Sequence, residues 1–281
     1  MLNKYGYKTS LVSILKTYEW DLFKRVKITP IYLYDNEFFG RLFSGLYVKC
    51  RIEIDSDIII AHNNPSVQVA LMLKKKMERK GKNVLIISYL HDILIYPITG
   101  SLFGEILRIF PQLLKKLERE YIIKSEIVLV NSKTSFERIM KNYNLKNLLE
   151  KVFILYPTVN IPVSKKMLVK DKKGYMLIVG RMDHEAFYNL YKIMKVLDYP
   201  LIIAGYGHPY NPNFRKILML FKMLKKAGKK IKIIFCPSDV QLFELYRNAS
   251  LFVYPGHENF NMSAIEAMSA GCPVLVANTS G

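Results

Sequence analysis

Short runs of apolar and β-branched residues alternate along this chain with longer stretches in which apolar positions recur every three or four residues. The short runs predict buried strands, and the longer stretches predict amphipathic helices. Strands are expected at residues 10–15, 28–33, 57–61, 83–88, 127–131, 152–155, 175–179, 201–204, 232–235, 251–254 and 273–277. Helices are expected at residues 37–50, 66–80, 102–123, 132–142, 185–197, 213–227, 240–248 and 262–270. This alternation is typical of βαβ units, so we expect an α/β protein built on parallel sheets.

The pattern is interrupted between residues 156 and 174, a segment with two prolines, five lysines and no clear apolar period. Such a segment indicates a linker, so we expect an N-terminal domain at residues 1–160 and a C-terminal domain at residues 161–281. A length of 281 residues suggests roughly two domains by the rule of about 150 residues per domain. Two doubly wound, Rossmann-like domains would face a cleft lined by the carboxyl ends of their strands, where such folds bind ligands.

Composition narrows the class of partner. Lys and Arg outnumber Asp and Glu by 42 to 23, a formal net charge of +19, so the chain should attract nucleic acid, anionic lipid headgroups or diphosphate ligands. Cys50, Cys236 and Cys272 are far apart and lack the paired spacing of a metal site, which favours reduced thiols in a cytoplasmic setting. The sequence shows neither a signal-peptide region nor a long apolar stretch, so no membrane span is expected.

Candidate chemistry is concentrated near the end of the chain. Glu258 follows the predicted strand 251–254, and Glu266 lies one turn inside the predicted helix 262–270. Unpaired amides and the dipole at the start of such a helix favour a phosphate, and flanking carboxylates can accept hydrogen bonds from sugar hydroxyls. An ordinary solvated loop followed by a glutamate on a helix surface would show the same spacing.

Two further candidates follow other predicted strands. Arg181 comes after strand 175–179, so its guanidinium would lie at the same sheet edge as Glu258 and could hold a diphosphate bidentately. His91 follows strand 83–88 and would point into the cleft from the first domain, although a lone histidine is more often structural.

These residues resemble the retaining glycosyltransferases of family four, which have the GT-B fold. Glu258 to Glu266 is similar to the family's Glu-x7-Glu motif, and the run EAMSAGCPV that begins at Glu266 is similar to its Glu-Ala-Met-x-x-Gly-x-Pro-Val run. The sequence VGR at residues 179–181 resembles another family element. Further landmarks occur in the expected order at residues 57–62, 90–92, 130–132 and 203–207. The resemblance covers nearly all of the chain and implies two Rossmann-like, doubly wound parallel-sheet domains facing a cleft.

The resemblance implies transfer of a sugar from a nucleotide diphosphate donor to an acceptor, with retention at the anomeric carbon and without a bound metal or other cofactor. Glu258 would hold hydroxyls of the donor sugar, Glu266 would bind the ribose hydroxyls, and Arg181 with the amides of residues 259–262 would stabilise the departing diphosphate. Catalysis is thus expected at Arg181, Glu258 and His91, and donor binding at Gly180, Asn259, Phe260, Asn261, Met262 and Glu266.

The chain departs from the family's pattern at several points. The family usually carries a lysine five positions after Arg181, but that position is Ala186 here, so a second cation for the diphosphate is missing. Asn259 and Asn261 replace two residues that are often glycine, and Asn tolerates left-handed backbone better than most residues. The family's first strand and final helices have no counterpart in this sequence, which predicts a fold that is incomplete at both termini.

The expected acceptor is a glycan or a lipid-linked molecule. The predicted helix 102–123 carries Lys115, Lys116 and Arg119 beside an apolar stripe, and helix 213–227 has a similar stripe. Most of each stripe should pack on a sheet. If part of the first stripe stays exposed, that helix could rest on anionic lipid at the cytoplasmic membrane face.

Three other interpretations stay open. Residues 55–57 match the Asp-x-Asp metal motif of another glycosyltransferase fold, but they precede an apolar strand rather than follow one, so no metal site is expected. A noncatalytic or degenerate glycosyltransferase-like subunit, which Ala186 favours, would bind nucleotide sugar without turnover. A nucleic-acid-binding protein is not favoured, because the charge comes without a recognition motif or a basic stripe interleaved with aromatics.

Overall fold

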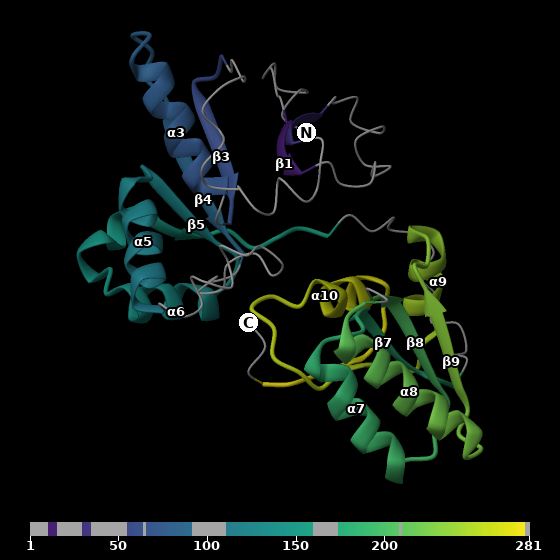
Figure 1. Ribbon diagram of the computed structural model, residues 1–281. Coiled ribbons are helices and arrows are strands. Elements are labelled where there is room, and N and C mark those ends of the chain that lie inside the picture. Colours follow the sequence, from purple (N-terminus) through teal and green to yellow (C-terminus); the bar gives the residue numbers. More distant parts are fainter. Residues whose placement is uncertain are drawn as a thin grey trace. The chain divides into compact units, whose positions relative to one another are not determined.

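The chain divides into two compact units, Met1–Leu155 and Tyr156–Gly281 (Figure 1). The computed structural model describes residues 11–15, 30–34, 55–63, 66–91, 111–159, 174–207 and 210–278. Every strand pair in these residues is parallel, as the alternation of elements predicted. The domain boundary expected between residues 160 and 161 lies outside the described residues.

The first unit contains two sets of parallel strands. β1 (Leu11–Leu15) pairs with β2 (Pro30–Tyr34), and a separate four-stranded sheet has the order β3-β4-β5-β6. The strands of this sheet are β3 (Ile58–His62), β4 (Leu85–Leu90), β5 (Ile127–Val130) and β6 (Val152–Ile154). The described helices are α3 (Ser66–Glu78), α5 (Pro111–Lys124), α6 (Lys133–Tyr143) and the 3-10 helix η2 (Lys146–Lys151). Apolar side chains from the four-stranded sheet and from the helices of this unit pack together in one core.

β4 ends later than the sequence predicted. We expected it to end at residue 88, but Tyr89 pairs with His62 of β3, and Leu90 pairs with Val130 of β5. The parallel ladder on both sides therefore extends β4 by two residues, and His91 follows the strand directly.

The second unit is built on a five-stranded sheet with the order β11-β10-β7-β8-β9. Its strands are β7 (Met176–Arg181), β8 (Leu201–Tyr206), β9 (Ile231–Phe235), β10 (Leu251–Tyr254) and β11 (Val274–Val276). Its helices are α7 (Glu185–Val196), α8 (Pro212–Lys226), α9 (Asp239–Asn248) and α10 (Met262–Ser269). The apolar stripe of α8 is buried in the core of this unit, as expected for a helix that packs on a sheet.

The strand order of the second unit reverses between β7 and β10. β8 and β9 extend the sheet on one side of β7, whereas β10 and β11 extend it on the other side. Because parallel crossovers are right-handed, this reversal places the helices after β7 and after β10 on opposite faces of the sheet. Doubly wound folds bind ligands at the carboxyl ends of the strands beside such a reversal. Here these strand ends are Arg181 and Tyr254.

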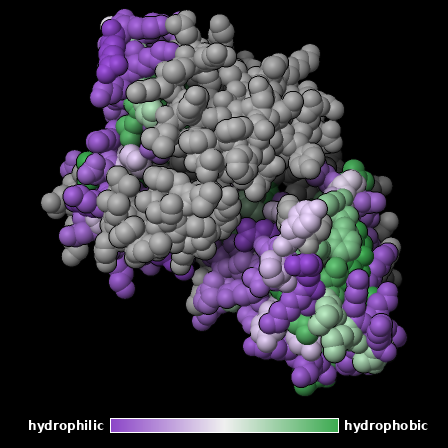
Figure 2. Space-filling model, viewed as in Figure 1, coloured by the Kyte–Doolittle hydropathy of each residue, from purple (hydrophilic) through white to green (hydrophobic). Residues whose placement is uncertain are grey.

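Two expected helices lie wholly or partly outside the described residues. These are the helix expected at residues 37–50 and the first part of that expected at 102–123, and the side chains of the stripe proposed to face lipid are also outside the described part of the chain. None of the helices in the described ranges combines the length and apolar character that a membrane-spanning segment needs. In Figure 2 hydrophobic surface is visible over β9, an edge strand of its sheet, where Phe235 is half exposed.

Two glycines bring β7 and β8 close together at their carboxyl ends. Gly180 pairs with Gly205, and a Cβ atom on Gly205 would lie 1.9 Å from the Gly180 carbonyl oxygen. Gly205 also has a φ of +144°, a backbone conformation that L side chains rarely adopt. The backbone that leads into Arg181 therefore requires glycine at position 205.

Gly205→Ala is expected to destabilise the second unit strongly. Overpacking against the backbone and φ strain together should cost about 3 kcal/mol or more. Gly228→Ala is the matched control, because Gly228 also has positive φ, at +89°, but a Cβ atom there would meet nothing within 4 Å. It should cost only about 1–2 kcal/mol of left-handed backbone strain. Equal losses for the two variants in chemical denaturation would contradict a role for the close approach.

Candidate functional site

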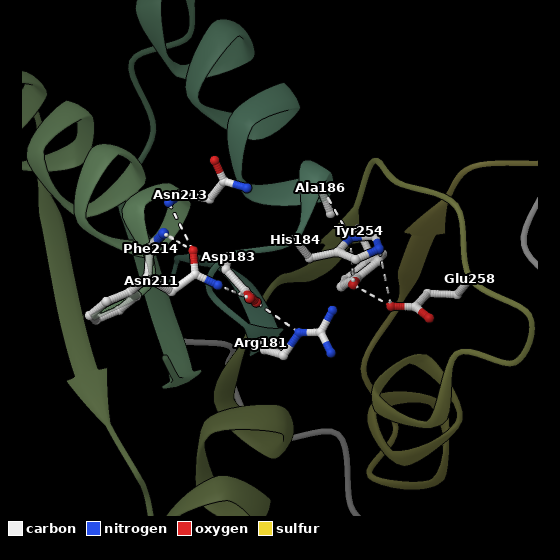
Figure 3. Close-up of polar contacts among 9 residues, drawn as sticks. All are labelled: Arg181, Asp183, His184, Ala186, Asn211, Asn213, Phe214, Tyr254 and Glu258. Atoms are coloured by element: carbon white, nitrogen blue, oxygen red, sulfur yellow. Dashed lines mark hydrogen bonds and ion pairs between the residues drawn. The ribbon is translucent and has the colours of Figure 1, made fainter. Parts of the chain in front are cut away.

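Arg181 and Glu258 come from neighbouring strands of the second unit. Arg181 is the last residue of β7, and Glu258 lies in the loop that follows β10, which pairs with β7. Figure 3 shows their side chains at this sheet edge together with those of His184 and Tyr254. The geometry of the unit is therefore consistent with the sequence prediction that a cation and a carboxylate lie at the same sheet edge.

The Arg181 guanidinium is oriented through its Nε atom. Nε donates to Asp183 Oδ1 at 2.7 Å, and the other Asp183 oxygen accepts from Asn211 Nδ2 at 2.7 Å (Figure 3). Asn211 Oδ1 also caps α8 by accepting from the backbone N–H of Asn213 at 2.9 Å. The Arg181 side chain stays 60% exposed, so its two terminal amino groups are accessible to an anion. A guanidinium held in this way can donate two parallel hydrogen bonds to a phosphate.

The Glu258 carboxylate is held by a hydrogen bond from Tyr254 and lies close to His184. Tyr254 donates its hydroxyl proton to Glu258 Oε1 at 2.6 Å, and His184 Nε2 lies 3.7 Å from the same oxygen. Burial, together with the hydrogen bond to Glu258 and its charge, raises the pKa of Tyr254 well above its usual value. The phenol therefore stays protonated and acts only as a donor toward the carboxylate.

Ala186, which stands where the resemblance led us to expect a lysine, is completely buried. It lies in the first turn of α7 and faces the loop after β10, because a Cβ atom added to Gly256 would lie 2.7 Å from Ala186 Cβ. The small side chain lets this loop pack tightly on α7. Because Ala186 is fully buried beside Gly256, a lysine side chain at this position would require the surrounding residues to move.

The start of α10 differs from the expectation for its two asparagines. Asn261 has φ −87° and ψ 87°, and among the described residues Asn259 is not one with positive φ, so neither needs the left-handed backbone we considered. Instead Asn261 Oδ1 caps α10 by accepting from the Ala264 N–H at 3.0 Å. This cap fixes the orientation of the side-chain amide, and Asn261 Nδ2 is buried without a hydrogen-bond partner.

The predicted donor amides are only partly available in this conformation. The Met262 N–H already donates to the Phe260 carbonyl at 3.2 Å. Phe260 is half-buried, and its ring centroid lies 6.2 Å from that of Tyr156. A phosphate that used the Met262 amide would therefore have to replace a local backbone hydrogen bond.

Glu266 lies one turn inside α10, as expected, and is paired with a buried tyrosine. The hydroxyl of Tyr246, from α9, donates to Glu266 Oε2 at 2.8 Å. Burial raises the pKa of Glu266, the Tyr246 hydrogen bond lowers it, and nearby Asp239 raises it, with a net increase. One carboxylate oxygen is thus occupied by Tyr246, and the other can accept from a ligand hydroxyl.

His91 lies in the first unit and belongs to a pair of histidines. Its Nε2 is 2.8 Å from His62 Nδ1, and the two rings stack with centroids 5.1 Å apart. Its backbone is fixed by Asn63, whose side chain accepts the His91 N–H, and by Asn131, whose side chain donates to the His91 carbonyl. His91 is therefore not the lone histidine that the sequence suggested. The relation of this pair to the Arg181 site remains a prediction.

The Asp-x-Asp motif lies at the amino end of β3, as the sequence indicated. Asp55 forms an ion pair with Lys82, and the Asp57 carbonyl accepts from the Leu85 N–H at the start of β4. In the described residues no three His, Cys, Asp or Glu side chains are grouped so that they could hold a metal ion. The two aspartates thus contribute to the joining of β3 and β4.

Several polar residues escaped the sequence analysis. They are His62, Asp183, His184, Asn211, Tyr246 and Tyr254. Two signals in the sequence could have indicated some of them. Asp183 and His184 are close to Arg181 in sequence, and Tyr254 lies at the end of a predicted strand. Asn211 and Tyr246 reach the site from separate elements, and a single sequence carries no signal for such contacts.

Comparison with known proteins indicates a class for part of the chain. Residues 161–281 match the family model described as "Glycosyl transferases group 1". A glycosyltransferase from Rickettsia africae ESF-5 has a similar structure, with a TM-score of 0.66 and 17% identity over 100% of this chain and 73% of that chain. The chain has the expected GT-B class of fold, with two Rossmann-like α/β units.

Individual relatives are distant. The chain is 23% identical to human "Alpha-1,3/1,6-mannosyltransferase ALG2" over 85% of its own length and 61% of that protein. It is 28% identical to "O-antigen chain mannosyltransferase B" of Escherichia coli over 44% of its own length and 33% of that protein. Anabaena Alr3699/HepE, solved in complex with UDP and glucose, gives a TM-score of 0.63 at 14% identity over 93% of this chain and 70% of that chain. The chain thus spans between one third and about three fifths of these two curated relatives.

Acid is expected to destabilise the first unit through the histidine pair. Partial desolvation lowers the pKa of His62 and of His91, and the neighbouring imidazole lowers that of His91 further. The unfolded state therefore binds more protons in the window below the ordinary pKa of about 6.5. Stability from the neutral pair is present above that pH and is lost as the pH falls through the lowered pKa values of the folded state.

His62→Gln should make this pH dependence shallower, because it removes one titrating ring and the repulsion that it exerts on the other. The control is His257→Gln, which removes an exposed histidine from the second unit. Chemical denaturation at several values between pH 7 and pH 5 measures the slope. An unchanged slope in His62→Gln would show that other groups control it.

Proposed function

We propose that this chain is a retaining glycosyltransferase that moves a sugar from a nucleotide diphosphate donor to a hydroxyl of a glycan or lipid-linked acceptor. The observation that carries the proposal is the oriented Arg181 guanidinium at the reversal between β7 and β10, with Glu258 in the adjoining loop and Glu266 inside the helix that follows. A cation and a helix N-terminus suit a diphosphate, and two carboxylates suit the hydroxyls on either side of it.

In the proposed reaction the acceptor oxygen bonds to the anomeric carbon, and the bond from that carbon to the diphosphate oxygen breaks. The electron pair stays on the diphosphate, so negative charge increases there, and the acceptor proton passes to that leaving group or to water. Arg181 is suited to stabilise this charge because Asp183 fixes its orientation beforehand. In the proposal Glu258 holds the donor sugar, Glu266 holds the ribose, and His91 of the first unit takes part in catalysis.

The buried Asn261 amide fits an oxygen-rich ligand at the start of α10. An unsatisfied buried donor costs about 1–3 kcal/mol, and a phosphate or hydroxyl oxygen that reached Asn261 Nδ2 would remove this cost. The proposal therefore gives an otherwise unpaired polar atom a hydrogen-bond partner.

A noncatalytic nucleotide-sugar-binding subunit is the second candidate, and Ala186 is the specific observation that favours it. Its side chain is buried against the Gly256 loop, so one cation that the resemblance led us to expect beside the diphosphate is absent. This candidate predicts saturable binding of a nucleotide sugar without transfer or hydrolysis.

Calorimetric titration with a panel of UDP- and GDP-sugars tests donor binding. We expect saturable binding of at least one member, and Glu266→Ala should weaken it at least about tenfold because ligand hydrogen bonds to a charged group are lost. Glu78→Ala, which removes an exposed glutamate from the first unit, should leave affinity unchanged. A folded chain that binds no member of the panel would overturn the proposal.

Turnover then separates the two candidates. Arg181→Gln should lower kcat about 10²- to 10³-fold while the chain stays folded, since one preorganised charge stabiliser is worth about 3–4 kcal/mol. Arg79→Gln, which removes an exposed arginine from the first unit, is the control for net charge. Donor hydrolysis or transfer that is absent in the unmodified chain, despite donor binding, would favour the noncatalytic subunit.

A further inference from the structure

Glu258 lies in a loop that forms two hydrogen bonds with α7. Asn189 Nδ2 donates to the Pro255 carbonyl at 2.8 Å, and the His257 N–H donates to Glu185 Oε1 at 3.1 Å. Gly256 packs on Ala186 between these two hydrogen bonds. The backbone on the amino-terminal side of Glu258 is thus fixed on the first turns of α7, and the remaining freedom of this residue is that of its side chain.

Tyr254 removes much of that freedom. It is the last residue of β10, only 3% exposed, and its ring centroid lies 6.5 Å from that of Phe252 in a stacked arrangement. A tyrosine ring fixed by strand backbone and core packing places its hydroxyl rigidly. Its single proton goes to Glu258 Oε1 at 2.6 Å, because a carboxylate is a stronger acceptor than the imidazole nitrogen 3.1 Å away.

The second group beside Glu258 is the His184 ring, and its hydrogen bonds indicate which ring nitrogen carries the proton. His184 is the N-cap of α7, and its Nδ1 accepts the Ala186 N–H at 3.3 Å. An Nδ1 atom that accepts a hydrogen bond carries no proton, so in the neutral ring the proton is on Nε2. Nε2 is the atom 3.7 Å from Glu258 Oε1.

One carboxylate oxygen is therefore engaged by the protein. Tyr254 donates a hydrogen bond to Glu258 Oε1 and His184 Nε2 lies 3.7 Å from the same oxygen, whereas no hydrogen bond or ion pair in the described part of the chain engages Glu258 Oε2 (Figure 3). The carboxylate keeps a defined orientation and one acceptor oxygen for a ligand.

We propose that Tyr254, which donates to Glu258 Oε1, and His184, whose Nε2 lies near the same oxygen, are positioning residues that present Oε2 as the acceptor for a hydroxyl of the donor sugar. This inference rests on the proposed function and deepens it. It assigns recognition of the sugar, as distinct from the nucleotide, to a Tyr–Glu–His cluster formed by the end of β10, the following loop and the N-cap of α7. The ligand class is a nucleoside diphosphate linked to a sugar with a free hydroxyl within reach of Oε2.

The test compares ligands with and without the sugar. Calorimetry measures the affinities of UDP-glucose and GDP-mannose, and separately those of UDP and GDP, for the full chain and for Tyr254→Phe. Because Phe keeps the buried ring and removes only the donor to a charged group, we expect affinity for the bound nucleotide sugar to fall about tenfold or more. Affinity for the matching nucleoside diphosphate should change less than about twofold, since Glu258 touches only the sugar.

Tyr175→Phe is the matched control. Tyr175 is also a buried tyrosine of the second unit, 8% exposed, and its hydroxyl donates to the Leu245 carbonyl at 2.8 Å. It precedes β7, at the end of that strand opposite to Arg181, so its loss should weaken neither ligand. His184→Asn is the second variant: Asn keeps a good N-cap and removes the Nε2 group near Glu258 Oε1, so it should weaken only binding of the nucleotide sugar.

A double-mutant cycle tests whether Tyr254 acts through Glu258. In a Glu258→Gln background, Tyr254→Phe should change nucleotide-sugar affinity by less than about twofold, because the group that it positions is already altered. Equal losses for sugar-linked and sugar-free nucleotide, or additive losses in the cycle, would overturn the inference and leave the proposed function standing. A folded, unmodified chain that binds none of the four ligands and no other member of the UDP- and GDP-sugar panel would instead overturn the proposed function.

Discussion

The pairing of β7 with β10 is the constraint on which the rest of the second unit depends. These strands are separated by about seventy residues of sequence, yet Leu251 lies beside Met176 and Phe252 beside Leu177. Because parallel strands end at the same edge, this pairing places the end of β7 next to the loop after β10, and the reversal of strand order at this point leaves that edge open to a ligand. The glycine contact between β7 and β8 then sets the backbone from which Arg181 projects.

Both carboxylates of the proposed donor site are held in the same way. Tyr254 donates to Glu258, and Tyr246 donates to Glu266. Each tyrosine ring is buried, so its hydroxyl position is fixed by core packing, and burial with the adjacent acid raises the pKa of both phenols. Each acid has one oxygen committed to the protein and another for a ligand. Binding of a hydroxyl-rich molecule would then require little reorganisation of either side chain, which is the usual physical basis of affinity in a preorganised site.

Arg181 is a basic side chain that the described part of the chain brings to this sheet edge. Ala186 lets the Gly256 loop pack on α7, and the same packing brings His184 and Tyr254 against Glu258. The local structure thus favours an accurately placed carboxylate, while Arg181 is the residue that we propose to contact an anion. Asp183 partly offsets the charge of Arg181 but fixes its direction, because the Asp183 carboxylate is itself held by Asn211 at the start of α8. Asp183 therefore lowers the net positive charge at this site but fixes the orientation of the Arg181 guanidinium.

The sequence by itself determined the alternation of elements, the parallel sheets and the positions of Arg181, Glu258 and Glu266 along the chain, because apolar periodicity and spacing are local properties that each segment carries. Its resemblance to a known family indicated the GT-B class of fold. Only the tertiary structure decided that β4 extends to Leu90, that His91 has His62 as its partner, and that Ala186 is buried against Gly256. It also decided which oxygen of each acid is engaged by a tyrosine. Those features depend on contacts between segments that are distant in sequence, and no local pattern in a single amino-acid sequence indicates such contacts.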